Sequence, residues 1–269
     1  MSKIKKLDSS VYNKIAAGEV VERPSSVVKE LVENALDAKA DTISIFVCEG
    51  GLSEITVTDN GCGIEKDDLA IAFLPHATSK IATAEDLVKI SSLGFRGEAL
   101  ASIASVATVV LKSRYYTEES GNLIKVRGGE IVERSPCGIA KGTIITVSNL
   151  FYNTPARLKF LKKPRYEEGE ITSLIIKFIL ANPSIKFNYS NESGDIFSSQ
   201  GEGLLSAIRI VYDKELVDSL ITVNNIKGNY SVNGYVSNAN YSKSNKTYQK
   251  IILNGRIINN ITISTALHN

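Results

Sequence analysis

Residues 25–38 have the sequence SSVVKELVENALDA, whose spacing of apolar residues predicts an amphipathic helix. Pro24 comes directly before two serines. This arrangement is typical of a helix start, because a serine oxygen can accept hydrogen bonds from the free N–H groups of the first turn. Proline is tolerated there because its position needs no N–H partner. The stretch therefore predicts a helix that begins at Pro24 and is capped by serine.

The two sides of this helix differ in chemistry. At about 100° per residue, one side collects the apolar residues Val28, Leu31, Val32, Ala35 and Leu36. Glu30, Asn34 and Asp37 follow one another at i, i+4 and i+7 on the other side. One side is therefore expected to pack on a core, while the other presents two carboxylates and an amide. A solvated polar face is the alternative at this point.

Three further motifs follow the helix. The predicted strand 54–58 runs directly into Asp59-Asn60-Gly61-Cys62-Gly63-Ile64. The next two motifs are His76-Ala77-Thr78-Ser79-Lys80 and Gly94-Phe95-Arg96-Gly97-Glu98-Ala99-Leu100. Several motifs in this order, at compatible spacing, indicate one family.

In these motifs the chain resembles the N-terminal ATPase region of the MutL family of DNA mismatch-repair proteins. That family is a branch of the superfamily that includes the gyrase ATPase subunit, the heat-shock chaperone ATPase and histidine kinases. Residues 16–24 and 94–103 resemble the mismatch-repair branch more closely than the gyrase or the chaperone. The resemblance implies an α+β fold, a two-layer α/β sandwich of the Bergerat ATP-binding type, followed by a partial second α/β domain.

The composition is that of a globular protein. Of 269 residues, 43% are hydrophobic and 22% are charged, without any low-complexity run. The most membrane-like run, residues 174–181, contains Lys177 and is shorter than the roughly 18 residues that a spanning helix needs. The first residues lack the apolar core of a secretion signal, so we expect a cytoplasmic protein, nucleoid-associated if bacterial. The three cysteines are odd in number and no two of them have the C-x-x-C spacing, which argues against a disulfide framework and a zinc site.

The segment from Asp59 to Gly63 is predicted to contact a nucleotide base. Ionised Asp59 is an acceptor without a competing donor, which suits the exocyclic amino group of adenine. Gly61 and Gly63 let the backbone approach a flat ligand closely, because no Cβ stands in the way. Asp-Asn-Gly is also a common turn, so a purely structural turn is the alternative.

The next motif offers phosphate-binding groups. Thr78, Ser79 and Lys80 supply two hydroxyls and an ammonium. His76 is one of only two histidines, so we expect it to make a structural hydrogen bond instead of joining a metal cluster. Pro75 stands where the family usually has arginine, and it removes both a charge and an N–H group. This departure concerns the local loop contacts and not the family assignment.

The glycine-bearing motif that begins at Gly94 leads into a predicted helix. Such a loop directs backbone N–H groups and the positive end of the helix dipole at one spot, which suits phosphate oxygens. The cofactor-binding residues predicted here are Gly94, Phe95, Arg96, Gly97, Glu98, Ala99 and Leu100. A G-x-x-x-x-G-K-[ST] sequence is absent, which excludes a P-loop. Gly142-Thr143 is similar to another family motif near the nucleotide, and it adds Thr143 to the predicted site.

The resemblance also implies the chemical roles. Glu30 is expected to take a proton from a water aimed at the γ-phosphorus of ATP, which is general-base catalysis. Asn34, one turn on, is expected to offer an amide oxygen to Mg²⁺. Glu33 faces about 60° away from Glu30 and is less suited as the base. Asp37 either supports the site or is simply solvated.

A basic cluster, here called the basic segment, occupies residues 157–165. It contains Arg157, Lys159, Lys162, Lys163 and Arg165. Because the formal net charge is only +2, any argument for nucleic acid depends on such local clustering. The segment could hold a DNA backbone without sequence specificity. Cations on the exposed side of a short helix are the alternative.

Two domains are expected. Residues 1–200 would form the ATP-binding domain, and residues 201–269 the start of a second, transducer-like α/β domain, because the sequence character shifts near Gly201. The family's His-Pro-Ala-Lys stretch, whose lysine reaches the γ-phosphate, has no counterpart here, so we expect truncation. Residues 3–17 resemble the family's arm across the partner subunit, which implies an ATP-dependent dimer.

Two functions fit these observations. The first is a MutL-like ATPase, Mg²⁺-dependent and slow, that acts as a nucleotide-gated dimer coupling a mismatch-recognition protein to downstream repair enzymes. The alternative is an ATP-holding clamp for DNA and partner proteins, with little hydrolysis in this truncated form. A gyrase-like strand-passing ATPase would require a cleavage-domain neighbour that the sequence does not show.

Overall fold

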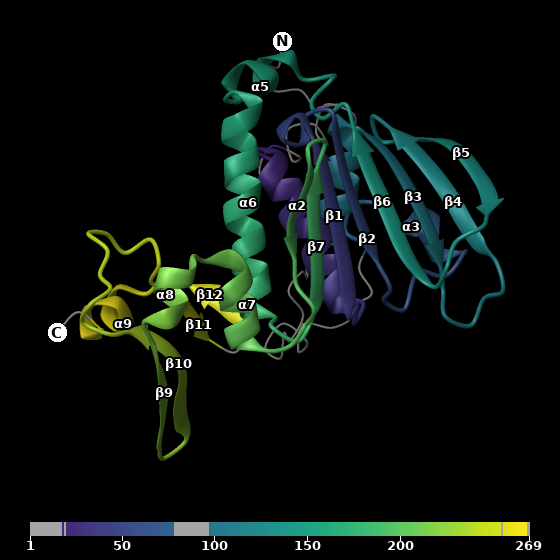
Figure 1. Ribbon diagram of the computed structural model, residues 1–269. Helices are drawn as coiled ribbons and strands as arrows, with labels where there is room; N and C mark the ends of the chain where they lie inside the picture. Colours follow the sequence, from purple (N-terminus) through teal and green to yellow (C-terminus); the bar gives the residue numbers. More distant parts are fainter. Residues whose placement is uncertain (1–17, 19, 78–96, 254, 268–269) are drawn as a thin grey trace, which may run out of the picture. The chain divides into compact units, whose positions relative to one another are not determined.

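A computed structural model describes residues 18, 20–77, 97–253 and 255–267 (Figure 1). The chain forms two compact units, each treated separately here. The first comprises Met1–Leu174 with Phe187–Ile196, and the second comprises Ile175–Lys186 with Phe197–Asn269. Within the described residues, none of the helices has the length and apolar character needed to cross a membrane.

An eight-stranded sheet has the strand order β5-β4-β3-β6-β2-β1-β7-β8. Its strands are β1 (Thr42–Cys48), β2 (Glu54–Asp59), β3 (Thr108–Arg114), β4 (Gly121–Arg127), β5 (Glu130–Cys137), β6 (Gly142–Ser148), β7 (Lys186–Asn191) and β8 (Gly194–Ser198). The neighbours from β5 to β1 in this order are all antiparallel. The alternation of residues 42–47, followed by the turn residues Gly50-Gly51 and the strand 54–58, predicts a hairpin, which is confirmed as β1 and β2.

The predicted helix is confirmed as α2 (Pro24–Asp37). Its buried residues are Pro24, Val27, Val28, Leu31, Val32 and Ala35. The predicted serine cap is wrong. Arg23 is the N-cap residue and no side chain caps the helix, because helical geometry already begins at Pro24 and both serines lie inside the first turn. The Ser26 N–H group is instead bonded to the Arg23 carbonyl at 2.9 Å.

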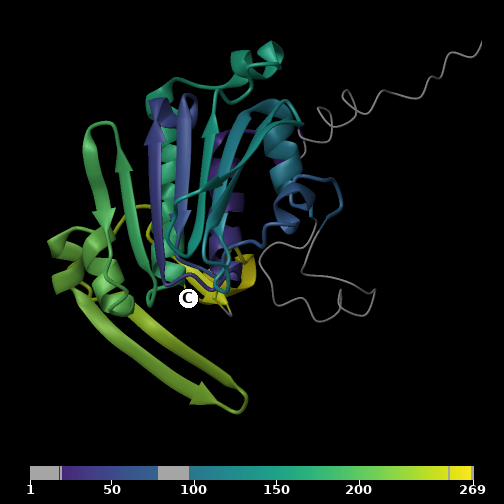
Figure 2. The same ribbon diagram turned by 90° about the vertical axis from the view of Figure 1, so that its right-hand side faces the viewer.

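The core lies on one face of the sheet. Two rows of buried apolar residues cross β1, β2, β6 and β3, namely Ile45, Val57, Ile145 and Leu111 in one row and Val47, Ile55, Val147 and Val109 in the next. The residues between them are only half-buried. Helix α2 contacts β2, and α4 (Ala99–Val106) contacts β3 and β4. Figure 2 shows α2, in purple, behind the strands. The arrangement is the expected two-layer sandwich.

Four shorter or later elements complete the first unit. They are η1 (Glu49–Gly51), α3 (Asp68–Ile71), α5 (Pro155–Phe160) and the start of α6 (Pro164–Ala181). The sequence from Lys66 to Phe73 predicts a helix, but only α3 is helical. The apolar stretch from Glu170 to Leu180 also predicts a helix, and α6 begins earlier than this, at Pro164. Proline fits that first helical position because it needs no N–H partner there.

The second unit mixes helices and short strands. Its elements are the end of α6, α7 (Leu204–Val211), α8 (Lys214–Asp218), β9 (Leu220–Lys227), β10 (Tyr230–Ser237), β11 (Ile251–Leu253), β12 (Arg256–Ile258) and α9 (Ile261–Ala266). Strands β9 and β10 pair with each other, as do β11 and β12. The sequence predicts a short helix over residues 204–212 and strands over 220–223, 230–236 and 249–253. The helix is present as α7, and the strands are present as β9, β10 and β11.

Candidate nucleotide-binding site

A row of polar residues ends the buried face of the sheet. Next to the two apolar rows, Asp59 of β2 stands opposite Thr143 of β6, and Thr143 stands opposite Ser113 of β3. Thr143 is 6% exposed and Ser113 is fully buried. Because opposed residues in antiparallel strands point to the same face, all three side chains lie on the side that carries the core. Polar groups stand here at positions where a third row of apolar residues would continue the two rows of the core.

Ser113 is the part of this row that the sequence analysis missed. Its hydroxyl accepts the Ile64 N–H group at 2.8 Å and lies 3.0 Å from both the Gly142 carbonyl and the Thr143 hydroxyl. It thereby ties the loop after β2 to β6. The signal was available in the alternation of Val109, Leu111 and Ser113 along β3, which puts a hydroxyl at a core position.

Asp59 is held at the end of β2 in a partly buried place. Its Oδ1 accepts the Gly61 N–H group at 2.8 Å. Burial raises the pKa of the Asp59 carboxyl, while hydrogen bonds from the Gly61 and Thr143 backbone oppose that shift. The carboxyl therefore faces a low-dielectric environment, in which a hydrogen bond to a ligand is stronger than in water.

The loop after β2 is fastened to the end of α2. The Cys62 N–H group donates to the Ala38 carbonyl at 3.0 Å, and the Asn60 side-chain oxygen accepts the N–H groups of Asp41 and Thr42, each at 3.1 Å. These bonds hold the loop after Asp59 against the residues that follow α2.

The glycines of this loop are required by the protein's own backbone. A Cβ at Gly61 would lie 2.7 Å from the Ala38 carbonyl oxygen. Gly63 has φ +77°, and a Cβ there would lie 2.1 Å from the carbonyl oxygen of Arg114. The close approach expected of a ligand is instead made by the end of β3 and the end of α2. Contact of these glycines with a nucleotide stays a prediction.

The polar side of α2 carries a small charge cluster. Lys29 Nζ lies 3.3 Å from Glu30 Oε1 and 3.1 Å from Glu33 Oε2. The Glu30 side chain is 22% exposed and that of Glu33 is 12% exposed, so both carboxylates are partly withdrawn from water. Burial raises the pKa of Glu33, an effect that Lys29 partly offsets. Asn34 and Asp37 are half-buried on the same side of the helix.

The start of α4 is tied to the segment before it. His76 Nδ1 lies 2.9 Å from Oε1 of Glu98, the N-cap residue of α4. This close contact is compatible with the structural hydrogen bond expected of His76, which stays a prediction. Gly97 has φ +61°, and Ala99 and Leu100 form the first turn of the helix. The predicted phosphate-binding residues Thr78, Ser79, Lys80, Gly94, Phe95 and Arg96 lie outside the described residues.

The basic segment divides into packed and exposed cations. Arg157 is half-buried, and its guanidinium carbon lies 5.9 Å from the centre of the Phe151 ring. Lys162 Nζ lies 3.8 Å from the centre of the Tyr166 ring. Lys159, Lys163 and Arg165 are exposed, and within the described part of the chain no ion pair holds them. These three are the most available cations of the segment.

Comparisons with known proteins agree with this geometry. Residues 22–134 match the family described as histidine kinase-, DNA gyrase B- and HSP90-like ATPase, and residues 208–269 match the C-terminal domain of DNA mismatch repair proteins. The solved MutL ATPase domain of Aquifex aeolicus, complexed with ADP, is 30% identical with a TM-score of 0.71, over 93% of this chain and 88% of that one. The chain belongs to the MutL family.

Curated MutL proteins are similar over nearly the whole chain. That of Macrococcus caseolyticus is 48% identical and that of Staphylococcus aureus 46%, each over 99% of this chain. A solved structure titled as the N-terminal domain of a DNA repair protein is 27% identical with a TM-score of 0.78, over 94% of this chain and 79% of that one. The chain spans about two fifths of the curated MutL relatives, 42% and 40%. The expected Bergerat-type sandwich is confirmed.

Proposed function

We propose that this chain is the ATP-binding and ATP-hydrolysing N-terminal region of a MutL-like mismatch-repair protein. The observation that carries the proposal is the polar row in which half-buried Asp59 stands beside buried Thr143 and Ser113, next to a loop fastened to the end of α2. Three adjacent polar groups are unusual in the core of a sheet, because apolar side chains normally fill it. They are expected at the bottom of a ligand pocket, where a few polar groups recognise a nucleotide base. The ADP complex of the Aquifex aeolicus relative supports a nucleotide as the ligand.

The proposed binding mode follows the residue chemistry. Asp59 accepts the adenine amino group, with Gly61, Gly63 and Thr143 beside it. Thr78, Ser79 and Lys80, together with residues 94–100, hold the phosphates through hydroxyl, ammonium and backbone N–H groups. Asp59 is half-buried and burial raises the pKa of its carboxyl, so a ligand hydrogen bond there competes with less water than on an open surface.

Magnesium fits this site only together with the nucleotide phosphates. Within the described residues no group of three or more His, Cys, Asp or Glu side chains could hold a metal ion. Mg²⁺ is commonly bound by one or two protein oxygens plus substrate phosphates and waters, so a single amide such as that of Asn34 is a sufficient protein ligand. When bound, the ion spreads the charge that develops on the phosphate oxygens.

Glu30 is the proposed general base, one turn from Asn34 on the same side of α2. Its carboxylate is only 22% exposed, and its Oε1 lies 3.3 Å from Lys29 Nζ, so the side chain is held on the polar side of the helix where a base is required. Hydrolysis is expected to be slow and to gate a dimer that couples mismatch recognition to later repair steps, with the protein in the cytoplasm near DNA.

The test separates binding from turnover. We expect Glu30→Ala to bind ATP with unchanged affinity in calorimetry and to lose phosphate release by roughly 10²- to 10⁴-fold, the usual contribution of a general base. Glu33→Gln is the matched control, because Glu33 lies on the same helix and shares Lys29. It should retain most turnover. Equal turnover in Glu30→Ala and wild type would remove Glu30 as the base, and a loss confined to Glu33→Gln would assign the role to Glu33.

DNA binding without appreciable hydrolysis is a second candidate function, and the exposed cations Lys159, Lys163 and Arg165 favour it. Replacing all three by alanine should weaken binding to duplex DNA and reduce the slope of log affinity against log salt by about 0.9 per lost phosphate contact. Alanine at the exposed Lys186, Lys214 and Lys227 is the control of equal charge. Equal salt slopes in both triple variants would exclude the basic segment as the DNA site.

A further inference from the structure

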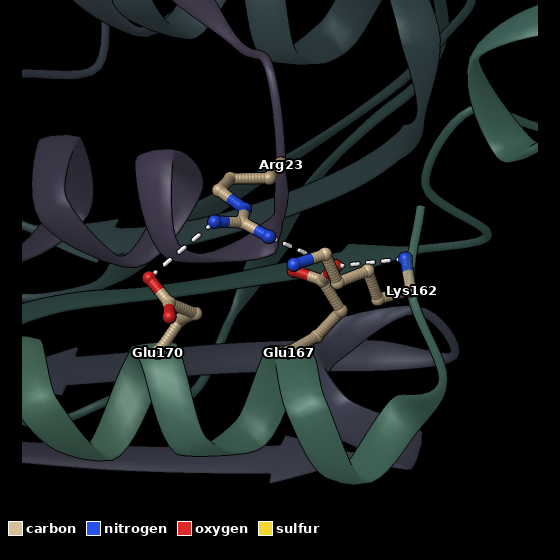
Figure 3. A network of polar contacts seen from close by, with 4 residues as sticks. All are labelled: Arg23, Lys162, Glu167 and Glu170. Atoms are coloured by element: carbon tan, nitrogen blue, oxygen red, sulfur yellow. Dashed lines mark hydrogen bonds and ion pairs between the residues drawn. The ribbon is translucent and has the colours of Figure 1, made fainter. Parts of the chain in front are cut away.

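Arg23 joins the start of α2 to the buried side of α6. Its Nη2 lies 3.1 Å from Glu167 Oε1, and its Nη1 lies 3.3 Å from Glu170 Oε2 (Figure 3). The Glu167 side chain is 0% exposed, so its Oε1 depends on protein donors in place of water. Since Arg23 is the N-cap residue of α2, this pair fixes the first turn of the helix that carries Glu30.

The same carboxylate holds the connection between α5 and α6. Glu167 Oε1 also accepts the backbone N–H group of Lys162 at 3.1 Å (Figure 3). Lys162 belongs to the basic segment. One buried oxygen atom therefore contacts both the start of α2 and the basic segment.

An aromatic ring makes a second connection between the same two parts. The guanidinium carbon of Arg23 lies 5.5 Å from the centre of the Tyr166 ring, and Lys162 Nζ lies 3.8 Å from it. Cations within about 6 Å of a ring centre are attracted to it. Because Glu167 and Tyr166 each contact both residues, a movement of Lys162 changes the surroundings of Arg23 at both of these side chains.

We propose that Arg23 is a positioning residue that, through Glu167, couples the basic segment to the helix of Glu30. When DNA phosphates bind the cations of the basic segment, the contacts of Lys162 with Glu167 and Tyr166 change. Because Glu167 and Tyr166 also contact Arg23, the position of Arg23 at the start of α2 changes as well. Arg23 precedes Glu30 by about two helical turns, roughly 10 Å, so it acts through α2 and not on the substrate. The inference rests on the proposed function and adds the residues that link its two surfaces.

Hydrogen exchange tests this coupling without requiring hydrolysis. Arg23→Lys keeps the charge but loses the planar fork that reaches two carboxylates at once. We expect amide exchange in residues 27–31 and in residues 161–163 to become about tenfold faster in this variant, because a charge-assisted contact is lost. Duplex DNA should slow exchange in residues 27–31 of wild type but not of the variant. Arg134→Lys, on exposed β5, is the matched control and should behave as wild type.

Two further measurements keep the inference distinguishable from simple structural support. Glu170→Gln removes only the outer, 43% exposed partner and should show the same pattern more weakly, even if Arg23→Lys folds poorly. In phosphate-release assays of the full-length protein, Arg23→Lys should lower kcat, leave KM unchanged and abolish any effect of DNA on kcat. A wild type that releases no phosphate would refute the proposed ATPase function, while hydrogen exchange still decides the coupling.

The coupling is overturned by either of two results. One is DNA-dependent protection of residues 27–31 that is equal in wild type and Arg23→Lys, or absent from both. The other is faster exchange in only one of the two segments, since that would mean that Glu167 supports each segment separately.

Discussion

At the scale of single residues, Gly142 determines how closely β6 approaches Asp59. Its φ is +122°, and a Cβ there would lie 2.1 Å from the Asp59 carbonyl oxygen. Glycine alone adopts such a backbone conformation without strain. The geometry of the polar row therefore depends on the absence of one methyl group.

Gly142→Ala should lower the free energy of unfolding by at least roughly 1–3 kcal/mol, the cost of the backbone strain alone. Urea denaturation measures the change. Gly138→Ala is the control, because a Cβ at that glycine meets nothing within 4 Å, and it should change stability by less than about 0.5 kcal/mol. Equal stability of the two variants would show that β6 does not approach Asp59 as described.

Asp59 makes stability depend on pH in a direction set by burial. Because the folded-state pKa is raised above the ordinary 3.8, the folded protein keeps this proton while the unfolded chain has lost it. Stability relative to Asp59→Asn should therefore fall as pH rises from about 4 through the folded pKa, and then level off. Urea denaturation of both proteins across this range tests the sign. A relative stability that stays constant or rises with pH contradicts the burial of Asp59.

Two residues of the polar row could be predicted from the sequence, and the third could not. Asp59 and Thr143 were found because each stands in a recognisable motif, whereas Ser113 has no motif and becomes significant only through the strand register. Arg23 and Glu167 are 144 residues apart, so their pairing leaves no local pattern.

At the scale of elements, α6 is a long helix with a glycine on its exposed side. A Cβ at Gly169 would meet nothing within 4 Å, and the helix continues on both sides of it. The buried residues Ile171, Ile175 and Ile179 recur every four positions, which places the packed side elsewhere on the helix.

Gly169→Ala should raise the free energy of unfolding by about 0.5–1 kcal/mol, because alanine loses less conformational freedom on forming a helix. Ser173→Ala, also exposed on α6, should give a smaller gain. Thermal or urea denaturation distinguishes them. A loss of stability in Gly169→Ala would mean that this position faces a neighbour that its open surroundings do not include.

The elements themselves were largely predictable. The 3.6-residue repeat of α2 and the alternation of β1 and β2 are local patterns, and both predict the elements that the structure has. The helix cap was mispredicted because serine preference and proline at the first position compete, and proline fixed the start.

At the scale of the whole molecule, the division into domains followed composition less closely. The sequence predicted a boundary near residue 200, and this stays a prediction. Contacts divide the chain inside α6, after Leu174, because one continuous helix contributes to both compact units. A change of composition cannot reveal an element that two units share.

The central claim is that a nucleotide is bound by the polar row beside α2. Its most direct test is calorimetric titration of ATP with Mg²⁺ into wild type and Asp59→Ala, with cooperative melting of both proteins as the check on folding. We predict a saturable binding heat in wild type and at least about a tenfold weaker affinity in Asp59→Ala, as expected for loss of a buried hydrogen bond to a ligand. Equal affinity in the two folded proteins, or no binding by wild type, would contradict the account.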